Sequence, residues 1–193
     1  MQSFDDEQLQ KAIDDIVEWW RERGRDEIAD DLAPGAPAER LDEVAARLGA
    51  PLGAELRALY GRHDGQRDRE SKWFFGDLCF AALSYALDLQ SGMVLSYFGV
   101  GPNGERAPET VFAAKQTPLQ AEEYDGRWLP IANDGGDFVA VHLGTGRVAR
   151  ARKGELPAIR IVAPSLTSYV SDIASALWDD RFDELSSGRI GPS

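Results

Sequence analysis

A short polar stretch between two apolar runs constrains the fold more than any other part of the chain. The stretch is residues 133–137 (NDGGD), and it separates residues 128–132 from residues 138–143, which contain aromatic and β-branched side chains. Such side chains favour strands, and paired glycines supply the positive φ angles of a tight turn. Pro130 cannot donate a ladder hydrogen bond, so we expect an edge or a bulge there. The pattern predicts a β-hairpin over residues 128–143.

The residues that follow the hairpin extend it into a larger sheet. Residues 147–152 alternate arginines with small apolar residues, and Ile159 and Ile161 alternate about Arg160, which is the period of a strand. The arginines of residues 147–152 fall on both registers, so we expect at least one face of the sheet to be wet. Residues 128–163 therefore predict an antiparallel meander.

Apolar residues at helical spacing predict helices before and after this sheet. The clearest stripe runs through residues 5–23, where Trp19 lies beside the apolar face and is expected to be partly exposed. The other predicted helices pass through residues 41–48 and 56–63, follow an N-cap at Ser84, and run from Pro164-Ser165 to Trp178. Residues 73–75 and 78–80 predict short strand segments around a turn at Gly76-Asp77. These elements predict an α+β fold, with a twisted antiparallel sheet and helices packed mainly on one side.

Composition restricts the classes of partner and the compartment. The chain has 33 acidic and 21 basic residues, a formal net charge of −12, which argues against nucleic-acid binding because that normally needs a basic face. The single cysteine, Cys79, cannot form an internal disulfide, which fits a reducing compartment. There is no run of eighteen apolar residues, and the first residues do not have the pattern of a secretory signal. We therefore expect a cytoplasmic protein that does not enter a membrane.

The sequence predicts no catalytic, metal or cofactor site. Residues 99–104 match G-x-G-x-x-G, but Pro102 interrupts the pattern and no helical stripe follows, so a polar loop is the better interpretation. His63, His142 and Cys79 are not placed together by any predicted element, which argues against zinc. The hairpin tip lacks the spacing of a Ca²⁺ loop, and no serine lies in a G-x-S-x-G elbow. We expect a protein that is not an enzyme and that holds no cofactor.

Several segments, in the right order, resemble the SUKH superfamily (the Smi/Knr type). They are residues 51–66, which end in His63-Asp64-Gly65-Gln66, residues 73–76, residues 83–87, the hairpin, and residues 162–170. The hairpin has two glycines where many members have three. The resemblance spans roughly residues 40–178 and implies an α+β fold in one domain, residues 1–193. Residues 1–36 would be an acidic N-terminal helix and linker, and residues 179–193 a tail.

The resemblance also implies a function. Bacterial SUKH proteins are largely immunity proteins, which bind and neutralise toxins, often nucleases, that competing cells deploy. We therefore expect a non-enzymatic immunity protein against a cognate polymorphic toxin encoded next to it. An acidic protein would suit a basic toxin domain, because complementary charge speeds encounter. The expected contact surface consists of acidic residues at turns, with two tryptophans as anchors: Asp64, Asp77, Asp125, Asp134, Asp137, Trp73 and Trp128.

Two alternatives remain open at this point. Fungal members of the superfamily are linked to cell-wall synthesis and signalling, which would make this chain a regulatory scaffold with several host partners. A domain that binds a small molecule, or a hydrolase whose residues form no familiar pattern, is the third class. A melting temperature that depends on a ligand, without any protein partner, would indicate the third class.

Overall fold

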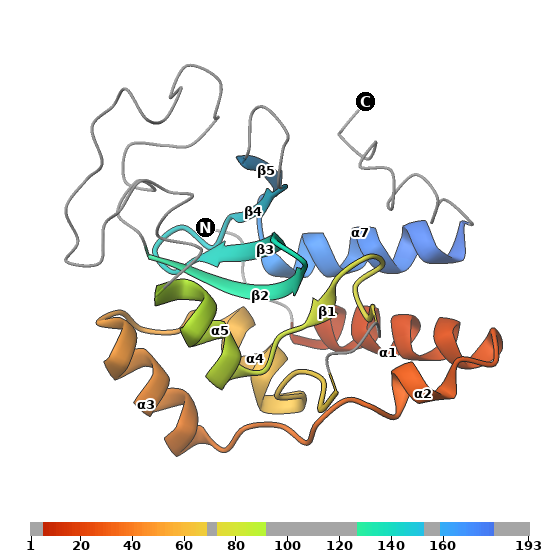
Figure 1. Cartoon of the computed structure of the whole chain (residues 1–193), viewed down its shortest axis with the longest axis horizontal. Helices are drawn as coiled ribbons and strands as arrows, with labels where there is room; N and C mark the ends of the chain where they lie inside the picture. The colour runs from red at the N-terminus through yellow and green to blue at the C-terminus, as the bar shows by residue number, and fades with distance from the viewer. Residues whose placement is uncertain (1–5, 69–72, 92–126, 153–158, 180–193) are drawn as a thin grey trace.

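The computed structural model of the chain describes residues 6–68, 73–91, 127–152 and 159–179 (Figure 1). The strands in this part are β1 (Cys79–Phe80), β2 (Trp128–Asp134), β3 (Asp137–His142), β4 (Val148–Ala151) and β5 (Ile159–Ala163). They form one antiparallel sheet in the order β1-β2-β3-β4-β5. The helices are α1 (Asp6–Glu22), α2 (Asp26–Ala29), α3 (Ala38–Leu48), α4 (Ala54–Arg62), α5 (Leu83–Leu89) and α7 (Leu166–Trp178).

The helices gather mainly on one side of the sheet (Figure 1). α1 packs along α7 and against α4, and α5 packs against β2. The apolar stripes of these helices and one face of the sheet share a core, in which Leu9, Val139 and Val170 are fully buried. Removal of this apolar surface from water is the main force that holds the layers together. The predicted α+β fold is confirmed.

The central hairpin has the predicted register and turn. Trp128 pairs with His142 at one end of β2 and β3, and Asp134 pairs with Asp137 at the other. Gly135 and Gly136 form the turn with φ angles of 53° and 118°, which side chains with a Cβ rarely adopt. The register shifts between Pro130 and Ala132 because β2 carries a bulge there. Pro130 therefore sits at a bulge in an interior strand.

The prediction of a wet face is wrong for β4, in which no residue is exposed, whereas Arg160 in β5 is exposed. The face away from the main core carries a second buried cluster: Trp128, Phe138, Ala140, Ala149, Ala151 and Ile159. On the other face, the side chains of Arg150 and Arg152 are only 12% and 13% exposed. Both guanidiniums pair with Asp77, so their charge is compensated by a partner from outside the meander.

Several local predictions also need correction. Trp19 is 4% exposed, because it packs edge-on against Trp20. Ser84 lies inside α5, and the N-cap position is Ala82. The segment 73–75 forms no strand, and its Phe75 makes only an isolated bridge to Leu78. The short helix α2 was not predicted at all. The predicted loop at 99–104 and the rest of residues 92–126 lie outside the described residues.

Candidate functional site

One end of the sheet brings together residues that are far apart in the sequence. The hairpin turn lies there, and the indole Nε1 of Trp73 donates a hydrogen bond to Oδ2 of Asp134 over 3.2 Å. Asp137 faces Asp134 across the turn. We call Trp73 and residues 134–137 the tip surface. It contains three of the seven residues predicted to contact a partner.

The exposure of Trp73 follows from how its neighbours pack. Phe74 and Phe75 are fully buried and pack against Phe80, with ring centroids 6.2 and 5.3 Å from it. The carbonyl of Phe74 also accepts a hydrogen bond from the indole of Trp20. These contacts fix the backbone immediately after Trp73, and Trp73 itself remains 40% exposed. A large aromatic ring is thus held at the surface by buried neighbours on one side and by Asp134 on the other.

Asp77 lies in the turn before β1 and joins that turn to β4. Its carboxylate pairs with Arg150 and, at 3.5 Å, with Arg152, and its side chain is 24% exposed. Tyr169 of α7 lies beside the pair, and burial raises the pKa of its hydroxyl; Arg150 lowers this pKa and Asp77 raises it, each by a smaller amount. Asp77 therefore has a structural role, in which it neutralises arginines between the sheet and α7.

Asp64 belongs to a junction between α4 and α5. Its Oδ1 accepts a hydrogen bond from the backbone N–H of Leu83 over 2.8 Å, which satisfies one of the free donors at the start of α5. Next to it, the Gln66 side chain accepts from the N–H of Phe80, and the Gln66 N–H donates to the carbonyl of Phe80. The His-Asp-Gly-Gln element thus ties the end of α4 to the strand and helix that follow.

Trp128 is not an exposed anchor. Its side chain is fully buried, and its ring centroid lies 4.9 Å from that of His142 on the neighbouring strand. His142 is also buried, with Nδ1 accepting the N–H of Thr145 over 3.0 Å. The alternation of His142 with Phe138 and Ala140 predicts a half-buried residue, but His142 is only 1% exposed. The last of the seven predicted contact residues, Asp125, lies outside the described residues.

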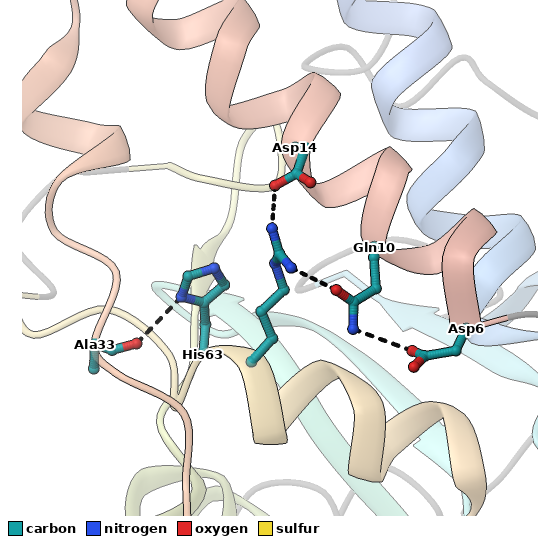
Figure 2. A network of polar contacts seen from close by, with 6 residues as sticks. Asp6, Gln10, Asp14, Ala33 and His63 are labelled. Atoms are coloured by element: carbon teal, nitrogen blue, oxygen red, sulfur yellow. Dashed lines mark hydrogen bonds and ion pairs between the residues drawn. The ribbon is translucent and has the colours of Figure 1, made fainter.

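A second polar network joins α1 to the end of α4, and no pattern in the sequence predicts it (Figure 2). The guanidinium of Arg62 donates to Gln10 and to Asp14, and the Gln10 amide donates to Asp6. These three α1 residues follow one another at intervals of four, which places them on one helix face. An open hollow on this face is lined by Asp6, Glu7, Gln10, Lys11 and Asp14.

His63 lies at the edge of the same network. Its Nδ1 is 3.3 Å from the carbonyl of Ala33. Burial lowers the pKa of the ring, while the Ala33 carbonyl acts in the opposite direction. The nearby Arg62 lowers the pKa further and Asp14 raises it, so the ring stays neutral near pH 7. His63 is the C-cap residue of α4 and is half-buried.

Several carboxylates on and between the helices pair with cations of the protein itself. Most of its ion pairs are exposed: Lys11–Asp15, Arg21–Asp30, Arg25–Glu27, Arg40–Glu43 and Arg57–Asp42. By contrast, no cation in the described part of the chain pairs with Asp134, and its carboxylate accepts only the indole N–H. Asp134 is exposed, and its carboxylate is therefore available for an external cation.

The described residues form neither a metal site nor a helix that could span a membrane. No group of three or more His, Cys, Asp and Glu side chains among them could hold a metal ion. None of the described helices is both long and apolar enough to span a bilayer.

Comparison with known proteins identifies the family. A protein-family model described as the SMI1 / KNR4 family (SUKH-1) matches residues 35–172, well over half of the chain. The matched range includes the junction around Asp64, the hairpin and most of α7. No curated protein matches the chain.

Proposed function

The chain belongs to the SMI1/KNR4 family (SUKH-1), and from this premise we propose that it is an immunity protein. It binds a cognate protein toxin encoded next to it and neutralises the toxin by occupying its surface, without catalysing a reaction. The setting is competition between bacteria, and the protein acts in the cytoplasm of the cell that makes it. The toxin domain is basic, and a nuclease is one such domain.

The observation that carries this proposal is the tip surface. It presents an exposed, oriented tryptophan next to a carboxylate that no described cation neutralises. Tryptophan is enriched among the residues that dominate the energy of protein interfaces. The net charge of −12 supports a basic partner, because opposite charges accelerate association and raise specificity.

The residues of the family motifs stabilise the fold, which leaves partner binding to other residues. Asp64 and Gln66 hold backbone groups of α5 and β1, and Trp128 packs inside the sheet. These side chains make their contacts inside the protein. Recognition of a particular partner is then left to surface residues, such as those of the tip surface.

A regulatory scaffold of the Smi/Knr type is the second candidate. Trp178 at the end of α7 is 41% exposed, and its indole donates to the carbonyl of Asp15 in α1. It gives the protein a second exposed aromatic on different elements, which suits a protein with more than one partner. Pull-down from host lysate would then recover several host proteins with the wild-type chain.

Co-expression with the product of the adjacent reading frame tests the immunity proposal. We expect that product alone to stop growth, and the two together to restore growth and to co-purify as a complex. A toxic neighbour that is neither rescued nor bound by this chain would contradict the pairing. Several host partners, with a neighbour that is not toxic, would favour the scaffold.

A further inference from the structure

The tip surface has the features of a receptor for a positively charged side chain. Trp73 is 40% exposed, and its indole N–H is already used by Asp134. A guanidinium or ammonium group is attracted to the face of an indole, more strongly than to the face of Phe or Tyr. The Asp134 carboxylate beside the ring can accept hydrogen bonds from the same group.

Local charge favours such a guest and disfavours an anion. Asp134 and Asp137 are paired across a two-residue turn, so their carboxylates share one end of the hairpin. Asp134 is exposed and Asp137 is half-buried. Arg150 and Arg152 of the neighbouring β4 segment pair with Asp77. The exposed carboxylate of Asp134 raises the local concentration of cations.

The surface is also organised before a partner arrives. The indole–carboxylate hydrogen bond restricts the ring of Trp73, and the buried Phe74 and Phe75 restrict its backbone. A side chain that is already ordered loses little entropy on binding, so more of its contact energy contributes to affinity.

We propose that Trp73 and Asp134 together bind an arginine or lysine side chain of the partner. The cation stacks on the Trp73 ring and pairs with the Asp134 carboxylate. This inference rests on the proposed function and specifies the contact by which a basic toxin is recognised. It assigns no such role to the other exposed tryptophan, Trp178.

A first test needs no partner and uses cesium and iodide as probes of tryptophan fluorescence. In Trp178→Phe, Trp73 is the exposed tryptophan of the described part, since Trp19, Trp20 and Trp128 are at most 5% exposed. For each ion, the quenching constant of the Trp73 fluorescence is divided by that of free N-acetyltryptophanamide. We expect this ratio to be at least about twice as large for cesium as for iodide, and we expect Asp134→Asn to bring the two ratios closer together. Equal quenching by the two ions, or a preference for iodide, would overturn the assignment of a cationic guest.

The second test measures binding of the toxin obtained by co-expression, with calorimetry at two salt concentrations. Trp73→Ala should raise Kd by about tenfold or more, and Asp134→Asn should raise Kd and flatten its salt dependence. Trp178→Ala, a matched change at a tryptophan of equal exposure, should alter Kd by less than about twofold. Thermal unfolding of each variant confirms that the fold is kept.

The outcomes separate this inference from the function on which it rests. A wild-type chain that does not bind the neighbouring product contradicts the proposed function. A wild-type chain that binds, with Kd unchanged in folded Trp73→Ala and Asp134→Asn, contradicts only the site. Equal losses in Trp73→Ala and Trp178→Ala would also contradict it, because the proposal places the contact at one tryptophan.

Discussion

Substitution of Gly65 by alanine should lower the free energy of unfolding by about 3 kcal/mol or more. Gly65 has a φ of +72°, and a Cβ built there lies 2.3 Å from the backbone N of Ala82 and 2.5 Å from its Cα. These are backbone atoms at the start of α5, so no flexible side chain can move aside. The junction that Asp64 and Gln66 also stabilise would have to open. Urea unfolding followed by circular dichroism measures the change.

Gly24→Ala is the matched control for this prediction. Gly24 has nearly the same φ, +66°, but nothing lies within 4 Å of the position its Cβ would take. The control therefore carries the backbone strain without the collision, and we expect a loss of only about 1 kcal/mol. Similar losses at Gly24 and Gly65 would show that the junction with Ala82 is looser than described.

Substitution of Asp77 by alanine should lower the free energy of unfolding by about 2–3 kcal/mol. The carboxylate pairs with both Arg150 and Arg152, whose side chains are nearly buried. Its removal leaves two guanidiniums at the edge of the core without that partner, and a poorly compensated buried charge is costly. In urea unfolding, the concentration at which half of the protein is unfolded should fall. The dependence of the unfolding free energy on urea concentration should stay the same if the denatured state is unaffected.

Asp42→Ala provides the comparison for Asp77. Asp42 also pairs with an arginine, Arg57, but its side chain is 67% exposed. An exposed ion pair contributes little, so this change should cost less than about 1 kcal/mol. If Asp77→Ala proved as mild as Asp42→Ala, the pairing at β4 would be a surface feature and not part of the core.

Much of the fold is predictable because its signals are local. The apolar stripe of α1 and the turn glycines of the hairpin specify an element from a few adjacent residues. Pro130 likewise predicted an edge or a bulge, and a bulge is present there. Local signals fail where a contact spans the sequence: the cap of α5 comes from Asp64, nineteen residues before Leu83, so Ser84 was a misleading candidate.

The candidate site was only partly predictable for the same reason. Trp73 and Trp128 are alike as residues, and both adjoin aromatic or apolar neighbours. The two residues differ in their tertiary environment. Trp128 lies on an interior strand against His142, whereas Trp73 precedes β1 and is exposed at the surface. Asp77 and Arg150 are 73 residues apart, and nothing in either segment predicts their pairing.

The same distinction clarifies how the family motifs relate to function. Asp64 was expected on the contact surface because it lies at a turn, yet its carboxylate holds the start of α5. Asp134 also lies at a turn, and its carboxylate faces the surface tryptophan. These two acidic residues therefore differ in role. Asp64 stabilises the fold, whereas Asp134 is available to a partner, which supports the proposed recognition of a basic partner.

The most direct measurement of the central claim is the activity of the purified toxin as this protein is added in increasing amounts. Neutralisation by binding predicts that activity falls in proportion and is abolished at a fixed stoichiometric ratio, with the toxin recovered intact when the complex is separated. Inactivation of many toxin molecules by each molecule of this protein, or a covalently altered toxin, would contradict the claim, because it would require an enzyme.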